Sequence, residues 1–167
     1  MIIHVDIDGT IIDIYSEFEK AFGITKKNFS YNLDERYYPG ALDDMIRLLE
    51  DDVDDIVYDG SFETINEMID AGHVVWITTL RSPLAIRRFQ EKYPGHASIV
   101  RSKHDIIESG DRCDVLVDDH PLPEHVDLAG KTFIIQRDYN ETYMPGLPRI
   151  ASIIDIVPVI TGEQVVL

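Results

Sequence analysis

Apolar runs alternate with amphipathic segments along most of the chain. Short apolar runs typical of strands occupy residues 2–6, 73–79, 97–100, 114–117 and 131–136. The run at 73–79, HVVWITT, is apolar enough to predict an inner strand buried on both faces. Apolar residues at helical spacing predict helices at residues 13–22, 61–71, 82–93, 105–109 and 149–156, with a β-rich tail after the last. This alternation predicts an α/β fold, a Rossmann-like parallel sheet sandwiched by helices.

Local signals mark several of these boundaries. Ser82-Pro83 combines a favoured N-cap residue with proline at the first helical position, so it indicates a helix start. Gly23 and Gly110 follow helical patterns and indicate helix ends.

The alternation breaks between residues 14 and 58. This stretch holds the helix at 13–22, a second amphipathic segment near 41–49, and no convincing strand. A small helical cap inserted after the first strand explains the break. We therefore predict a core domain of residues 1–13 and 59–167 and a cap of residues 14–58.

Charge and composition limit the classes of partner. The 167 residues suit one domain with a small subdomain, and 31 acids against 15 Lys plus Arg give a net charge of −16. Such a field repels polyanions, so we expect no polymeric nucleic acid as partner. No apolar run approaches the roughly 20 residues of a membrane span, and we expect no membrane partner. The single Cys113 and the lack of a basic N-terminal leader favour a cytoplasmic location, and the oligomeric state is left open.

Reactive side chains stand where the predicted strands stop. These groups are the run Asp6-Ile7-Asp8-Gly9-Thr10, the pair Thr78-Thr79, Lys103 in a predicted loop after residues 97–100, and the pair Asp118-Asp119. Because the carboxyl ends of parallel strands meet at one edge of a sheet, we expect these groups to converge. Several carboxylates in one crevice need a cation or an anionic ligand nearby, and oxygen ligands in that number suit Mg²⁺.

The first motif has a chemical interpretation. Residues at i and i+2 of an extended segment point the same way, so Asp6 and Asp8 can address one substrate. A carboxylate nucleophile divides phosphate removal into two steps through an aspartyl-phosphate, and a second carboxyl can serve as general acid and base. Gly9 permits a sharp turn, and Thr10 can bond locally and hold the loop. Lys103 can neutralise phosphoryl oxygens.

These motifs, in this order, resemble the haloacid dehalogenase-like superfamily of phosphohydrolases. VDIDGT, VVWITT, Lys103 and VLVDD match its pattern over residues 2–119. The resemblance implies that Asp6 is the nucleophile and Asp8 the general acid/base. It implies magnesium ligands from the Asp6 carboxylate, the Asp8 backbone carbonyl and the Asp118 carboxylate, with Asp119 in the set or just outside it.

The resemblance also implies a phosphate-binding hydroxyl at the end of strand 73–79. Thr78 and Thr79 both fit, and Thr79 is preferred because the next loop opens with Leu80-Arg81. Together with Lys103, Gly9 and Thr10 complete the expected phosphate-binding set. Arg81 is expected at the mouth of the site, where it can touch substrate.

The branch that the chain resembles most is the 5′-nucleotidase, deoxyribonucleotidase-like branch. The small cap, VDDHP, the turn Asp138-Tyr139-Asn140 and Arg149 carry this likeness, while TTLRSP and the position of Lys103 depart from it. It implies a nucleoside 5′-monophosphate, or a similar small phosphorylated metabolite, as substrate. Cap aromatic residues such as Tyr15 can stack on a base.

Other functions stay open or are excluded. A phosphatase of a sugar phosphate or phosphoprotein, and an inactive binding protein on the same fold, are the alternatives. A receiver domain would place its acidic pair first along the chain, and a P-loop kinase would need GxxxxGK[ST], which does not occur.

Overall fold

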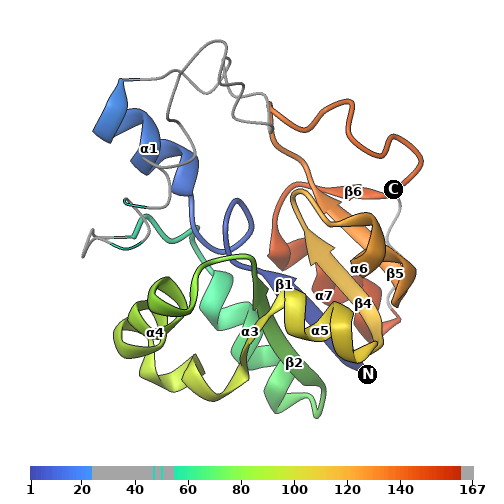
Figure 1. Cartoon of the computed structure of the whole chain (residues 1–167). Helices are drawn as coiled ribbons and strands as arrows, with labels where there is room; N and C mark the ends of the chain where they lie inside the picture. Colours follow the sequence, from blue (N-terminus) through green and yellow to red (C-terminus); the bar gives the residue numbers. More distant parts are fainter. Residues whose placement is uncertain (24–46, 48–49, 51–54, 163–167) are drawn as a thin grey trace.

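The computed structural model describes residues 1–23, 47, 50 and 55–162. In this part of the chain six parallel strands form one sheet, in the order β3-β2-β1-β4-β5-β6. The strands are β1 (Ile2–Asp6), β2 (Val74–Thr79), β3 (Val100–Ser102), β4 (Cys113–Asp118), β5 (Ala129–Ile135) and β6 (Arg149–Ile150). The sheet confirms the predicted α/β architecture, with β2 as an inner strand between β1 and β3 (Figure 1).

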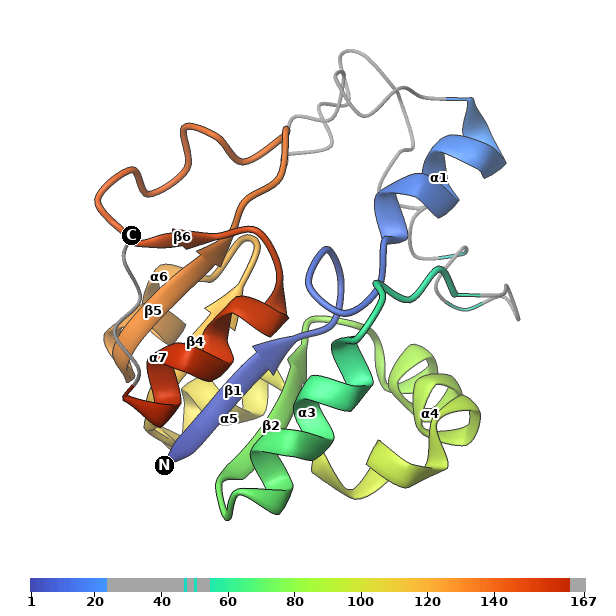
Figure 2. The same cartoon turned by 180° about the vertical axis from the view of Figure 1, so that it is seen from behind.

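Helices cover both faces of this sheet. The described helices are α1 (Ile14–Phe22), α3 (Ser61–Asp70), α4 (Pro83–Lys92), α5 (Lys103–Ser109), α6 (Pro123–Asp127) and α7 (Val157–Thr161), with 3₁₀ helices at Pro94–Ile99 and Ile153–Ile156. α5 and α6 lie on one face, whereas α3 and α7 lie on the other (Figures 1 and 2). None of the helices in the described segments is long and apolar enough to cross a membrane.

The main core lies between the sheet and the helices on the face that α3 covers. Alternate residues of the inner strands are buried in it, including Val5 of β1, Ile77 of β2 and Val117 of β4. Ile65 and Met68 of α3 pack against them, one helical turn apart. Burying such side chains stabilises the fold by about 1.5–3 kcal/mol each. This packing holds the strands in fixed positions, and so it also fixes where the strand ends lie relative to one another.

Helix ends follow the local signals of the sequence. α1 is capped by Asp13, whose carboxylate accepts the amide of Ser16, and it ends at Gly23 with a left-handed φ of 68°. Ser82 caps α4 by accepting the amide of Ala85. Gly110 ends α5 with φ 73°. The predicted boundaries at Ser82, Gly23 and Gly110 are confirmed.

Three predicted elements differ from the structure. Most of the predicted strand at 97–100 is 3₁₀ helix, because Pro94 opens a tight turn and pairing with β2 begins only at Val100. The predicted helix at 149–156 is instead strand β6 followed by a 3₁₀ helix, and the predicted β-rich tail begins with α7. Pairing of β6 with β5 satisfies backbone groups that a helix would otherwise have bonded internally.

Only part of the predicted cap is described, namely residues 14–23, 47, 50 and 55–58. α1 extends from the edge of the sheet at which β1 and β4 end (Figure 2). Most of the segment predicted as a second cap helix, near 41–49, lies outside the described residues. The division into a core of 1–13 and 59–167 and a cap of 14–58 therefore stays a prediction.

Candidate active site

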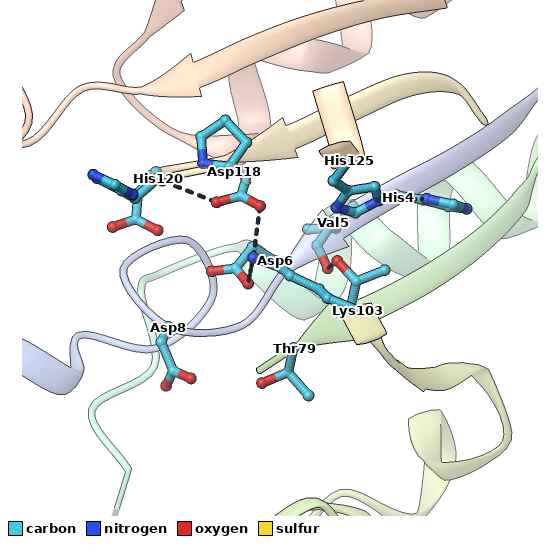
Figure 3. A network of polar contacts seen from close by, with 12 residues as sticks. His4, Val5, Asp6, Asp8, Thr79, Lys103, Asp118, His120 and His125 are labelled. Atoms are coloured by element: carbon cyan, nitrogen blue, oxygen red, sulfur yellow. Dashed lines mark hydrogen bonds and ion pairs between the residues drawn. The ribbon is translucent and has the colours of Figure 1, made fainter. Parts of the chain in front are cut away.

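A buried lysine joins two carboxylates at the carboxyl ends of β1 and β4 (Figure 3). Lys103 Nζ lies 2.6 Å from Asp6 Oδ1 and 2.7 Å from Asp118 Oδ2. All three side chains are buried. The prediction that Lys103 stands in a loop is wrong: it is the first residue of α5, directly after β3, and this rigid position aims its side chain at Asp6.

A third carboxylate completes the cluster. Asp6, Asp118 and Asp119 each offer an oxygen, and these oxygens lie within 4.8 Å of one another. Asp118 Oδ2 accepts a hydrogen bond from Lys103, and Asp118 Oδ1 accepts one from the backbone amide of His120 at 2.9 Å. The sequence prediction that these strand ends converge is thus met in the geometry.

The cluster holds more buried negative than positive charge. Burial raises the pKa of Asp6 well above its ordinary value. The charge of Lys103 lowers this pKa, and the neighbouring carboxylates raise it further, so the net shift is upward. Burial and Asp118 raise the pKa of Asp119 to about 7. Burial alone would lower the pKa of Lys103, but Asp118 and Asp6 outweigh it and the net shift is upward. A divalent cation among these oxygens would offset the excess charge, so the residues present fit such a metal.

Asp8 stands apart from this cluster and pairs with Arg81. Arg81 Nη2 donates to Asp8 Oδ1 at 2.6 Å, and Nε donates to Asp8 Oδ2 at 3.0 Å. The Arg81 side chain is 4% exposed and that of Asp8 is 25% exposed. Burial alone would lower the pKa of Arg81, but Asp8 raises it above its ordinary value. Arg81, expected at the mouth of the site, is therefore buried against the predicted acid/base.

The threonines near the site differ in their bonding. Thr78 Oγ1 donates to the carbonyl of Val5 at 3.4 Å, while Thr79 Oγ1 accepts the amide of Arg81 at 3.1 Å. An accepted bond leaves the Thr79 hydroxyl proton for a ligand, which favours Thr79 over Thr78. Thr10 makes its local bond through the backbone, since its amide donates to the carbonyl of Ile7 at 3.3 Å. Its buried hydroxyl has no partner among the described residues.

Gly9 lets the loop after β1 approach Asp119 closely. Its φ is +82°, in the region that glycine favours. A Cβ at this position would lie 2.4 Å from Asp119 Oδ2 and 2.5 Å from Tyr139 Oη. Both conformation and space therefore require glycine here, as the predicted sharp turn implies.

The turn after β5 contributes contacts that sequence reasoning missed. Tyr139 Oη donates to Asp119 Oδ2, and Asn140 Nδ2 donates to the carbonyl of Asp119 at 2.6 Å. Arg137 Nε donates to the carbonyl of Gly9 at 2.9 Å. The sequence singled out this turn only for its family likeness. Its position after a strand of the same sheet was the available signal for a role at the site.

Two histidines lie in the core beside the cluster. His4 Nδ1 is 3.0 Å from His125 Nε2, and both rings are fully buried. Burial lowers the pKa of His4 to about 4 and that of His125 to about 3, so both are neutral at pH 7. Both rings are therefore part of the buried core next to the cluster.

Comparisons by sequence show no relative. No family model matches the chain. No curated protein matches it either.

Solved structures do share the fold. CbbY from Rhodobacter sphaeroides, in complex with phosphate, is similar with a TM-score of 0.60 and 13% identity over 93% of this chain and 96% of that one. A haloacid dehalogenase-superfamily hydrolase from Ehrlichia chaffeensis has a TM-score of 0.61 and 11% identity, covering 96% of both chains. A phosphatase of the same superfamily from Thermococcus onnurineus has a TM-score of 0.56 and 16% identity over 98% of this chain and 99% of that one. The chain therefore has the haloacid dehalogenase-like fold.

Proposed function

We propose that the chain is a magnesium-dependent phosphomonoesterase of the haloacid dehalogenase-like superfamily, acting through an aspartyl-phosphate at Asp6. The observation that carries this proposal is the cluster in which Lys103 bridges Asp6 and Asp118, with Asp119 beside them. Its position at the carboxyl edge of a parallel sheet is where α/β folds hold ligands. The fold shared with superfamily hydrolases gives independent support.

Asp6 is the proposed nucleophile. One of its carboxylate oxygens attacks the phosphorus of the substrate, and the bond from phosphorus to the leaving oxygen breaks. Lys103, 2.6 Å from Asp6, stays charged and reduces the repulsion between this carboxylate and an anionic phosphoryl group.

Asp8 is the proposed general acid and base. Asp8 takes a proton from solvent when it leaves Arg81, and its carboxyl gives this proton to the leaving oxygen in the first step. In the second step Asp8 takes a proton from water as the water attacks phosphorus, and the bond between phosphorus and Asp6 breaks. Arg81 holds the Asp8 carboxylate in the free protein, so Asp8 must exchange this contact for the leaving oxygen of the substrate.

The proposed metal-binding residues are Asp6, Asp118 and Asp119, whose carboxylate oxygens lie together. The family resemblance adds the backbone carbonyl of Asp8 to this set. The bound Mg²⁺ would supply charge neutralisation for the phosphoryl oxygens. Thr79 and Lys103, with the loop at Gly9 and Thr10, make up the proposed phosphate-binding set.

The proposed substrate is a small phosphorylated metabolite, with a nucleoside 5′-monophosphate as the first candidate. The likeness of the Asp138-Tyr139-Asn140 turn to the nucleotidase branch supports it. A sugar phosphate is the second candidate, because a protein from Bacteroides vulgatus provisionally named β-phosphoglucomutase shares the fold with a TM-score of 0.56.

Phosphate release tests this proposal. Purified protein with Mg²⁺ should release nitrophenol from p-nitrophenyl phosphate, and Asp6→Asn should abolish that release. Asp70→Asn, at an exposed position of α3, is the matched control and should keep full activity. A panel of nucleoside monophosphates, sugar phosphates and phosphoserine then identifies the substrate class. Equal activity in wild type and Asp6→Asn would contradict the proposal, and equally feeble rates on the whole panel would count against a nucleotidase.

A further inference from the structure

We infer that Tyr139 and Asn140 are positioning residues that fix Asp119 for a bound divalent cation. This inference rests on the metal site of the proposed function. It concerns the turn that follows β5, whereas the proposed metal ligands lie at or just after the ends of β1 and β4.

The turn holds both the side chain and the main chain of Asp119. The phenol of Tyr139 donates to Asp119 Oδ2 at 2.5 Å. The amide of Asn140 donates to the backbone carbonyl of Asp119 at 2.6 Å and to that of Ile135 at 2.8 Å. Asp119 follows the end of β4, and Ile135 ends β5, so Asn140 ties the two strand ends together.

Asn140 is itself held on its other side. Its side-chain oxygen accepts the backbone amide of Arg137 at 3.0 Å and Arg149 Nη1 at 3.2 Å. Arg149 Nη2 also donates to the backbone carbonyl of Asn140 at 3.1 Å. The Asn140 amide therefore uses both its donor and its acceptor atoms while 1% exposed, which leaves it one orientation.

Tyr139 has little freedom to turn away from Asp119. Its ring packs on Tyr15 of α1, with the ring centroids 4.1 Å apart. The absence of a side chain at Gly9 gives its hydroxyl the space to reach Asp119. A hydrogen bond to one oxygen of a carboxylate fixes how the other is presented, and removing such an outer partner weakens metal affinity roughly 10- to 100-fold in known sites.

Manganese binding tests the inference without substrate. Mn²⁺ is titrated into the full chain, and free Mn²⁺ is followed by electron paramagnetic resonance. Tyr139→Phe should weaken Mn²⁺ affinity about tenfold or more. Tyr143→Phe is the matched control, since its hydroxyl donates to the carbonyl of Pro121 at 2.7 Å and to no proposed ligand. It should change the affinity less than about twofold.

A double-mutant cycle separates positioning from general damage. In an Asp119→Asn background, Tyr139→Phe should cause little further loss of Mn²⁺ affinity, because the carboxylate that it positions is gone. Equal losses in both backgrounds would overturn the inference, as would an unchanged affinity in Tyr139→Phe or no Mn²⁺ binding by the wild type. If Tyr139→Phe does not fold, Asn140→Asp, which removes the amide donor, replaces it in the same cycle.

The two proposals fail in different ways. Intact, Tyr139-dependent Mn²⁺ binding without phosphate release would contradict the proposed function and leave this inference standing. If the protein is an active phosphatase but Tyr139→Phe binds Mn²⁺ as tightly as the wild type does, the inference is contradicted and the proposed function stands.

Discussion

The guanidinium of Arg81 binds the carboxylate of Asp8 through two nitrogens, with Nη2 2.6 Å from Oδ1 and Nε 3.0 Å from Oδ2. The pair links the loop after β1 to the loop after β2, which are 73 residues apart in sequence. It gives the predicted acid/base a fixed place before substrate binds. Because Arg81 is buried and Asp8 only partly so, most of the cost of breaking the pair falls on Arg81.

Removing Asp8 should therefore destabilise the protein through Arg81. We expect Asp8→Ala to lower the free energy of unfolding by about 2 kcal/mol, because a buried guanidinium loses its charged partner. Arg81→Met together with Asp8→Ala should cost clearly less than the sum of the two single changes. Urea denaturation of the four proteins measures this coupling, and strictly additive losses would contradict the pairing.

Gly9→Ala should strongly lower the rate of phosphate release, whereas Gly72→Ala should not. Both glycines have left-handed φ values, +82° and +84°, but a Cβ at Gly72 would meet nothing within 4 Å. Each change carries a backbone penalty of about 1–2 kcal/mol. Only the Cβ at Gly9 collides with Asp119 and Tyr139, so we expect at least about a hundredfold loss of phosphate release for Gly9→Ala alone, in line with losses that follow small misplacements of catalytic groups. Similar activities in the two variants would show that this close approach is unimportant.

Magnesium should stabilise the folded protein, and more so at higher pH. At about 100 times its Kd, Mg²⁺ adds roughly 2.7 kcal/mol, or about 5–10 °C in Tm for a chain of this size. Since the folded pKa of Asp119 is raised to about 7 from an ordinary value of 3.8, the metal-free protein binds the extra proton between these values and loses stability as pH rises through that window. Magnesium binding displaces that proton, so the gain in Tm should grow from pH 5 to pH 8.

Thermal unfolding with and without MgCl₂ measures this effect. KCl at matched ionic strength is the control and should give no comparable shift. A gain in Tm that is equal with KCl, or that shrinks as pH rises, would contradict a metal site at Asp119.

The convergence of the site could be predicted from sequence because it follows from topology. Asp6 and Asp118 end strands of one parallel sheet, and the strands are recognisable as short apolar runs. Once the strands are parallel, their carboxyl ends share an edge whatever the side chains do. The position of Lys103 on this edge was predicted as well, although its place at the start of α5 was not.

The pairings of Asp8 with Arg81 and of Asp119 with Tyr139 could not be predicted in the same way. Each depends on side-chain rotamers and on loops that meet across the sheet, and no local pattern encodes them. The strand β6 was missed for a related reason. Arg149 and Ile150 have no strand signature of their own, and pairing with β5 decides their conformation.

The central claim is that Asp6 carries the phosphoryl group, and chemical trapping tests it most directly. Protein mixed with substrate and Mg²⁺ is quenched and treated with borohydride, which reduces an aspartyl-phosphate to homoserine. Mass spectrometry of the N-terminal peptide should then find homoserine at position 6, and none after treatment without substrate. Phosphate release with an unmodified Asp6 and homoserine at another aspartate would contradict the account.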